Sequence, residues 1–489
     1  MANISLIGIL LLLVFFCIFL FITNVAMRHM HGRQLVDYTL VGRHLSFPIL
    51  SASLLVAWTW TTSIIGSAEA GIQYGISGGI NYTVWANLVF ILFIPMVIRL
   101  RRIMPEAITI TEFIGERFNL ALRKVFYIFT SLVAMYVLLE QAIGVATVFL
   151  PIFHIPFKIT VFCVVMMVTV YVTWGSMQGS VFNDVFLLFL IMILFAVIIG
   201  AFLVKFDLNF IYHGIVEKAA ELPSGESQAY LSVWSLSGFK YGIIAFVVSM
   251  GQVFLNQGYF SKAYAAKSSR TVVWGFVAGI FILWMPIPLL SSVVFGHAAI
   301  AYGAAGYAGS STYLVFQNFF SMFSLPYLII FAILMLAIGI GASANCLLGV
   351  QTVFMADFYA AIIKEDASDE EKIRFGRIIT VCIGLLCAFI AIALDGIPLL
   401  KIDTFCGIFF AAPSTVLFLS CYMEKLTAKT ATVALVLGLA AGLGTWVFVP
   451  NGWFLGTVLS FLVPVCVILA ASVFTQSRFN FARLKFYKL

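Results

Sequence analysis

The chain has 489 residues, of which 63% are hydrophobic and 10% are charged, and its mean hydropathy is +1.11. Because soluble domains carry about 25% charged residues, this composition excludes a soluble enzyme and indicates a polytopic protein of the lipid bilayer. The formal net charge of +7 comes from basic residues in short segments between apolar runs, so it reflects membrane topology and not nucleic-acid binding.

The first apolar run, residues 4–27, is interpreted as a retained transmembrane helix within a leading segment 1–30. No basic residue precedes it, it is longer than the apolar part of a signal peptide, and Arg28 and Arg33 follow it closely. The eight cysteines all lie within apolar runs and form no CxxC pair, so they predict neither a zinc site nor a disulfide framework.

Apolar runs separated by charged or Gly/Pro-containing loops predict about 13 transmembrane helices. The fold class is therefore predicted as an all-α integral membrane protein. The runs lie near residues 5–27, 47–76, 79–98, 124–150, 157–175, 180–204, 238–260, 271–297, 325–359, 375–396, 402–422, 430–449 and 453–474.

The basic residues predict the orientation of these helices in a cell membrane, inner or plasma. If the N-terminus is outside, 22 of the 27 basic residues lie in inner segments and five lie in outer ones, as the positive-inside rule requires. Segment 205–237 is then external and is predicted to form surface helices or hairpins. The cytoplasmic tail 475–489 interleaves basic and aromatic residues, which fits either a helix on the inner leaflet or a frayed terminus.

Three acidic residues fall clearly within the predicted spans, at least one helical turn from either end, where an ionisable side chain is costly and usually faces a cavity or a partner. Glu69 lies near the outer end of the second helix and either reaches interfacial water or belongs to a site. Glu140 either forms a hydrogen bond between helices or contacts a ligand. Asp184 either starts the sixth helix at the interface or belongs to a site.

The middle of the second helix, residues 58–63, reads Trp-Thr-Trp-Thr-Thr-Ser and is followed by several glycines. This composition predicts a locally unwound segment whose backbone groups need a cavity, a cation or a solute. A helix-packing face of small residues is the alternative. Residues 336–349 of the ninth helix, LAIGIGASANCLLG, are predicted to be a second glycine-broken segment suited to ion binding.

Four stretches in this order resemble the sodium/solute symporter family, and the resemblance runs from about residue 35 to 425. They are WTWTTSIIGSAEAGIQYGISGG from residue 58, ITEFIGERF (110–118), WGSMQGSVFND (174–184) and NQGYFSKAYAAKS (256–268). The first of them, with VGRHLSF before it, looks most like the urea permease branch.

The resemblance implies a ten-helix transport core over residues 31–425. Two inverted five-helix repeats, at about 47–204 and 238–422, would form this core, with solute bound near the midplane. Two terminal helices and the short basic tail, residues 426–489, would follow it.

The family's sodium site falls on positions that lack its usual ligands. Backbone carbonyls of the broken helix correspond to Val56 and Thr59, and a ninth-helix carbonyl corresponds to Ile338. Two hydroxyl side chains of the family fall on Gly341 and Ala342, which supply no side-chain oxygen. A sodium ion, the one metal that the resemblance suggests, is therefore doubtful here.

Asp184 matches an aspartate that, in some family members, helps to hold a second cation with residues lying on Ala344 and Asn345. Because a low dielectric disfavours an ionised carboxyl, we expect Asp184 with Asn345 to carry the coupling step, with a proton favoured over sodium. The rival interpretation makes Asp184 a structural hydrogen-bond acceptor at the start of the sixth helix.

The predicted function is secondary-active, cation-coupled symport of a small polar solute by alternating access, with sodium or a proton as the coupling ion and no cofactor. Trp faces would shape the solute site while hydroxyl and amide groups contact polar atoms. The predicted solute-binding residues are Trp58, Trp60, Thr62, Ser63, Ser249 and Gln252, with Asn81 and Glu140 added from their family positions.

Three alternatives remain at this point: a transport-inactive solute sensor, a facilitator that has lost sodium coupling, and a membrane-embedded enzyme. An enzyme would need paired acids or a His/Glu cluster at helical spacing within the spans. His154 and His297 are isolated near span ends, so an enzyme is not expected.

Overall fold

The computed structural model describes residues 2–28, 34–302, 323–394 and 399–487. Over these ranges every regular element is a helix, and one isolated bridge joins Leu45 to Ala266. Among the described helices, 12 are long and apolar enough to cross a membrane, and a bent pair raises the count to 13. The predicted all-α membrane fold is confirmed.

The spanning helices follow the predicted apolar runs closely. They are α1 (Ala2–Arg28), the bent pair α3 (Phe47–Trp58) and α4 (Ile65–Tyr74), α5 (Ile76–Ile103), α7 (Leu120–Phe153), α8 (Phe157–Trp174), α9 (Met177–Lys205), α12 (Leu236–Phe254), the continuous α14 (Ser269–Phe276), η3 (Val277–Trp284), α15 (Pro286–Ser291), η4 (Ser292–His297) and α16 (Ala298–Ala301), α18 (Leu325–Thr352) with its π-helical extension η5 (Val353–Ile363), α19 (Asp369–Ala393), α20 (Leu399–Ser420), α21 (Ala428–Phe448) and α22 (Trp453–Phe474).

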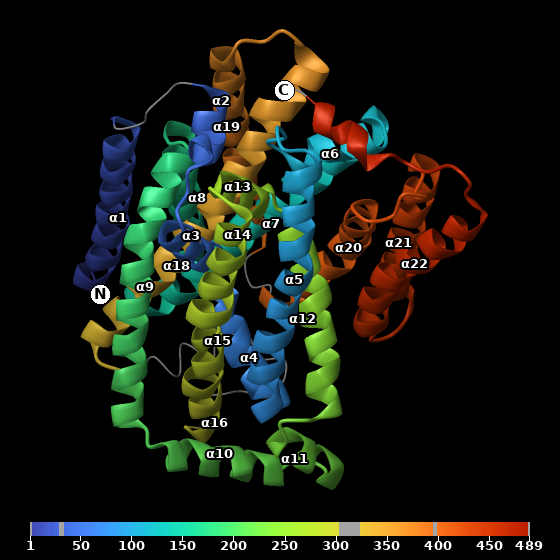
Figure 1. Cartoon of the computed structure of the whole chain (residues 1–489). Helices are drawn as coiled ribbons and strands as arrows, with labels where there is room; N and C mark the ends of the chain where they lie inside the picture. The colour runs from blue at the N-terminus through green and yellow to red at the C-terminus, as the bar shows by residue number, and fades with distance from the viewer. Residues whose placement is uncertain (1, 29–33, 303–322, 395–398, 488–489) are drawn as a thin grey trace.

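Shorter helices connect these spans or cover their ends. They are α2 (Leu35–Leu40), η1 (Val41–Arg43), η2 (Thr61–Ser63), α6 (Ile110–Arg117), α10 (Leu208–Ala220), α11 (Ser224–Leu231), α13 (Gln257–Ala265) and η6 (Phe481–Phe486). In Figure 1, α10 and α11 lie across one end of the bundle, whereas α6 and the C-terminus lie at the other.

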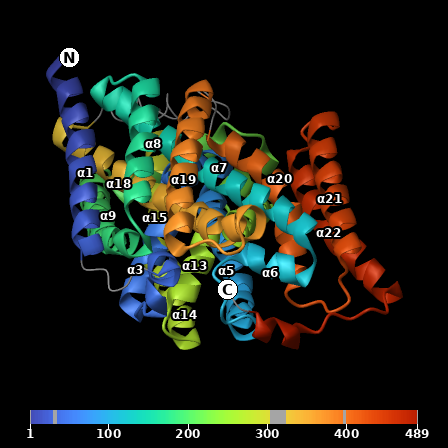
Figure 2. The same ribbon diagram turned by 90° about the horizontal axis from the view of Figure 1, so that it is seen from above.

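Helices of the core are buried far more than those at its edges. In α7, 83% of its most apolar 18-residue stretch is buried in the protein, whereas the corresponding share is 28% in α1, α21 and α22. Figure 2 shows α1 on one side of the molecule and α21 with α22 on the opposite side. The peripheral helices therefore face lipid, and α7 lies among its neighbours.

The predicted break in the second helix is confirmed, because α3 and α4 meet at a bend of 80°. Thr59 and Trp60 have extended backbone conformations, so the helix stops there. Side chains satisfy the freed N–H groups: that of Trp60 donates to Ser63 Oγ (3.1 Å), and that of Thr61 donates to Gln141 Oε1 (2.7 Å).

The second break predicted within residues 336–349 is wrong, because α18 runs through them as a continuous helix. Its glycines instead allow close packing: a Cβ on Gly339 would lie 2.7 Å from Val145 Cγ2, and one on Gly349 would contact Gly258. The second discontinuity lies between α12 and α13, where the Asn256 side chain accepts from the Gly258 N–H (2.9 Å).

Of the two alternatives for the C-terminal tail, the frayed terminus does not describe residues 481–486, because they form the short helix η6 against the protein itself. Phe481 and Leu484 are buried, and the Arg117 guanidinium lies 4.3 Å from the Phe479 ring centroid. These contacts hold the tail against the end of the bundle where α6 lies.

Candidate solute and cation sites

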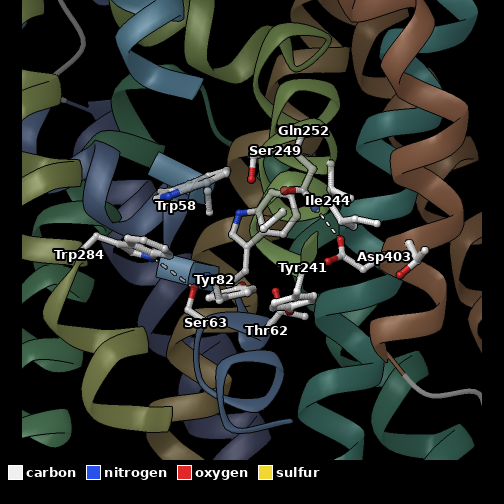
Figure 3. A pocket seen from close by; sticks show the side chains of 15 residues that line it. Trp58, Thr62, Ser63, Tyr82, Tyr241, Ile244, Ser249, Gln252, Trp284 and Asp403 are labelled. Atoms are coloured by element: carbon white, nitrogen blue, oxygen red, sulfur yellow. Dashed lines mark hydrogen bonds between the residues drawn. The ribbon is translucent and has the colours of Figure 1, made fainter. Parts of the chain in front are cut away.

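A pocket lies beside the break between α3 and α4, with walls from α5, α12, η3 and α20 (Figure 3). The space inside it for the centre of a water-sized sphere is about 30 Å³, so it admits only a small ligand. The lining residues are Trp58, Trp60, Thr62, Ser63, Tyr82, Ala86, Tyr241, Ile244, Ala245, Val248, Ser249, Gln252, Trp284, Asp403 and Thr404.

Aromatic rings make up a large part of the pocket wall. The Trp58 ring centroid lies 5.7 Å from that of Trp60 and 5.8 Å from that of Trp284. The Trp284 indole N–H donates to Ser63 Oγ (3.2 Å), which holds its ring in place (Figure 3). Tyr82 and Tyr241 stack at 6.4 Å on another side. These flat faces can enclose a planar or cationic ligand.

The polar wall centres on Asp403, the one ionisable carboxyl among the residues that line the pocket. Gln252 donates through Nε2 to Asp403 Oδ1 (2.8 Å), as Figure 3 shows, and the Tyr136 hydroxyl donates to the same oxygen. The lining residues include no lysine, arginine or histidine. The pocket therefore offers a carboxylate acceptor to N–H donors of a ligand.

Glu140 lies behind this wall on α7. Its side chain is fully buried, and neither carboxyl oxygen has a hydrogen-bond partner among the described residues. Asp403 is the charged group that acts most strongly on it, and Tyr136 and Thr62 are its other near neighbours. Two carboxyl groups thus lie close enough to interact electrostatically beside the pocket.

The structure brings together six of the eight residues predicted to bind solute. Trp58, Trp60, Thr62, Ser63, Ser249 and Gln252 all line the pocket. Asn81 does not: its amide donates to the Ser77 carbonyl (2.9 Å) and accepts from the Trp85 indole (3.0 Å). The next residue on α5, Tyr82, lines the pocket instead.

Apolar side chains occupy the surroundings of the predicted sodium position. A Cβ on Gly341 would contact Val56 Cγ1 and lie 2.9 Å from Leu187 Cδ1, so there is no room for a hydroxyl side chain. Ile338 and Ala342 are fully buried beside it, and the Thr59 hydroxyl donates to the Leu55 carbonyl (2.7 Å). The side chains here therefore offer few oxygen ligands for a hard cation such as sodium.

Asp184 is paired with Lys262, a residue that we did not predict as part of the site. The Lys262 ammonium donates to Asp184 Oδ2 (3.1 Å) and to the Ser53 carbonyl (2.8 Å), and the Ser53 hydroxyl donates to the same Asp184 oxygen. Both charged side chains are at most 1% exposed. The lysine thus supplies within the chain the positive charge that a bound cation would otherwise bring.

The expected hydrogen bond between Asp184 and Asn345 is not formed. Within the described ranges the Asn345 Nδ2 has no hydrogen-bond partner, and the Asn345 side chain packs against the backbone of Gly258. Lys262, one turn after Gly258 on α13, forms the ion pair with Asp184 instead. The geometry therefore leaves Asn345 as a packing residue between α18 and α13.

Sequence reasoning also missed Asp403 and three aromatic lining residues, although signals for them existed. Asp403 lies within the predicted run 402–422 and escaped the count of acids within spans. Lys262 belongs to the quoted stretch 256–268, just beyond a predicted run. Tyr82, Tyr241 and Trp284 look like ordinary membrane aromatics, and only the fold shows that they converge.

A model of the family described as "Sodium:solute symporter family" matches residues 38–438. Among curated proteins, the chain is 22% identical over 482 residues to the probable urea active transporter 1 of Schizosaccharomyces pombe, covering 89% of this chain and 71% of that protein. It is 24% identical over 450 residues to the urea-proton symporter DUR3 of Oryza sativa subsp. japonica, covering 84% of this chain and 60% of that protein.

Among solved structures, a Na⁺-coupled sialic acid symporter in a substrate-bound outward-open state superposes with a TM-score of 0.76. Sequence identity is 16%, and the match covers 96% of this chain and 98% of that one. This likeness bears on the fold alone. It confirms the implied core of two inverted five-helix repeats with flanking helices.

Proposed function

Because the chain belongs to the sodium:solute symporter family, we propose that it is a secondary-active symporter that takes up a small, neutral, N–H-rich solute of the urea class. The observation that carries this proposal is the pocket at the helix break, where aromatic side chains and the Asp403 carboxylate line one cavity and no basic side chain does. A cell membrane, with the N-terminus outside and the C-terminus inside, is the proposed location.

Urea and related amides are planar and carry several N–H donors and one carbonyl acceptor. Asp403 would accept from the N–H groups, while the hydroxyls of Thr62 and Ser249 would donate to the carbonyl oxygen. The Trp58 and Trp284 rings would cover the faces of the molecular plane. A sugar would instead demand many donors and acceptors on all sides, which this aromatic wall lacks.

The names of the relatives support this substrate class. Both curated relatives reported above carry urea in their names, and one is named as a proton symporter. The chain spans 60% of the rice protein's length and is 24% identical to it over the 450 aligned residues, so urea as the substrate of this chain is a proposal.

Transport would follow alternating access, in which one bundle rocks against the other around the midplane pocket. The two helix breaks, between α3 and α4 and between α12 and α13, both lie within the proposed ten-helix transport core. They would act as the places where half-helices change their tilt while their partners stay packed.

For the coupling ion we favour a proton over sodium. Val56 and Leu187 fill the space beside Gly341, and Lys262 already balances the charge of Asp184. Our proposal therefore gives Lys262 the place of a fixed cation and removes Asn345 from the coupling step. The same observations favour a second candidate, a facilitator that has lost sodium coupling, whose solute would equilibrate without accumulating.

The test of the substrate class is a binding panel on the purified full-length protein, read as ligand-induced thermal stabilisation. Urea, thiourea and acetamide should stabilise the protein, whereas glucose and sialic acid should not. Asp403→Asn should remove the stabilisation by urea, and Glu371→Gln on the exposed surface should keep it. Stabilisation by a sugar but by no amide would overturn the proposal.

A further inference from the structure

A buried carboxyl group with no partner requires a physical explanation. Glu140 is 0% exposed, and both of its oxygens lack hydrogen-bond partners among the described residues. An ionised carboxylate in such a place would cost several kcal/mol unless a positive charge stood beside it. The side chain therefore needs a cation, or it needs to hold a proton.

The groups that face Glu140 provide no such positive charge. The described groups that interact with it are all acids or neutral side chains. The facing groups are Asp403 and Cys406 on α20, Tyr82 on α5, Cys346 on α18, Thr62 on η2 and Tyr136 on α7 itself. Lys262 compensates Asp184 and does not act on Glu140.

Hydrogen bonding separates the roles of the two carboxyl groups. Asp403 Oδ1 accepts from Gln252 Nε2 (2.8 Å) and from the Tyr136 hydroxyl, an arrangement that stabilises an ionised carboxylate. Glu140 has only the Tyr136 and Thr62 hydroxyls as nearby donors; the Tyr136 hydroxyl donates to Asp403, and neither Glu140 oxygen accepts a hydrogen bond of normal geometry among the described residues. Two adjacent carboxyl groups in a low dielectric do not both ionise readily, so the proton falls on the group with fewer donors.

We propose that Glu140 is the proton-binding group of the transport cycle, with Asp403 as the ionised carboxylate that contacts the solute. This inference rests on the proposed function. A solute that donates N–H groups to Asp403 holds that carboxylate ionised, and the proton on Glu140 then keeps the site at one negative charge instead of two. Because the bound solute also excludes water from the two carboxyl groups, ionising both costs more in its presence, so solute and proton bind cooperatively at neighbouring positions, as symport requires.

The first test measures proton uptake on binding of urea by the full-length protein in weakly buffered detergent, with a pH-indicator dye. At a pH high enough to ionise Glu140 in the solute-free protein, wild-type protein should take up protons when urea binds. Glu140→Gln should bind urea with no proton uptake, because the amide mimics the protonated acid. Glu371→Gln, which alters an exposed glutamate paired with Lys364, is the control and should keep the wild-type uptake.

The second test is transport in sodium-free proteoliposomes, where external urea should acidify the interior. A one-to-one symporter sustains about a tenfold solute ratio for each unit of pH gradient. Glu140→Gln should lose both acidification and accumulation, so that its solute ratio falls to about one, whereas Glu140→Asp should recover part of both because it keeps a carboxyl group.

Two outcomes separate this inference from the proposed function. If wild-type protein binds and transports urea but Glu140→Gln still takes up protons as the wild type does, the Glu140 assignment is wrong and the substrate class stands. If wild-type protein binds no urea, the substrate class is wrong, and infrared spectroscopy without solute decides on Glu140. The carbonyl band of a protonated carboxyl should then disappear in Glu140→Gln and shift in Glu140→Asp, and an unchanged band in both variants would overturn the inference.

Discussion

At the residue scale, charged side chains within the bundle divide into two kinds. Asp184 has its counter-charge built in as Lys262, whereas Glu140 and Asp403 interact with each other without a basic neighbour. The sequence predicted that Glu140 and Asp184 lie within spans, because an acid in an apolar run stands out. It did not predict their partners, since Lys262 lies 78 residues from Asp184 and only packing brings them together.

Asp184→Asn alone should lower the free energy of unfolding by about 3–5 kcal/mol, because it leaves the Lys262 ammonium buried and uncompensated. The double variant Asp184→Asn with Lys262→Met should recover a substantial part of that loss. Thermal or denaturant unfolding of both variants measures this.

The exposed pair Lys364–Glu371, whose atoms lie 2.7 Å apart with side chains 50% and 42% exposed, is the matched control. Removal of its charges should change stability by less than about 1 kcal/mol. Equal effects at the two pairs would contradict the role assigned to burial.

The pocket hydroxyls offer a cleaner test of the solute site than its tryptophans. Trp58 packs against Phe90 and Tyr259 as well as facing the pocket, so its truncation would disturb the core. Thr62→Val and Ser249→Ala should each weaken urea binding by about 1 kcal/mol, roughly fivefold, with little change in melting temperature.

Thr432→Val is the control for these hydroxyl variants. The Thr432 hydroxyl is exposed on α21 and donates to the Ala428 carbonyl (3.0 Å). Thr432 does not line the pocket. Urea affinity should stay at the wild-type value in this variant. An unchanged affinity in Thr62→Val and Ser249→Ala as well would place the solute elsewhere.

At the element scale, the run of Trp, Thr and Ser residues at 58–63 predicted the first helix break, because such residues suit neither lipid nor a regular helix. The break predicted from the glycines of 336–349 is wrong, because glycine allows close helix packing as readily as it allows unwinding. Composition alone does not separate these two uses. Only the neighbours of Gly339 and Gly341 show which one applies.

Gly341→Ser restores a hydroxyl at a sodium-ligand position of the family, and it should not create a sodium site. Because Val56 and Leu187 occupy the space, the substitution should instead cost about 1–3 kcal/mol of stability through overpacking. Gly200→Ser on α9, where a Cβ would meet nothing within 4 Å, should cost far less. Sodium-dependent transport in a stable Gly341→Ser protein would contradict this account.

At the scale of the whole molecule, the number of spans and the ten-helix core could be predicted from hydropathy and family motifs, because both depend on local composition. The orientation in the membrane remains a prediction from the distribution of basic residues. The helices α10 and α11 lie at the opposite end of the bundle from the C-terminal tail, so the two ends can be labelled separately (Figure 1).

Single cysteines at the exposed Ser224 and Ser477 test this orientation. In intact cells an impermeant maleimide should label Ser224→Cys from outside and should label Ser477→Cys only after the membrane is opened. The exposed native cysteines, such as Cys17 and Cys466, lie in apolar spans, and the unaltered protein serves as the background control. The reverse pattern would invert the proposed topology.

The central claim is that this chain couples uptake of a urea-class solute to a proton. The most direct measurement is accumulation of radiolabelled urea by proteoliposomes of the purified protein, in the absence of sodium and under an inward proton gradient, with protein-free liposomes as the control for leakage. We predict accumulation above the equilibrium level that collapses when the proton gradient is dissipated. Accumulation that appears only with a sodium gradient, or urea that merely equilibrates under both gradients, would contradict the claim.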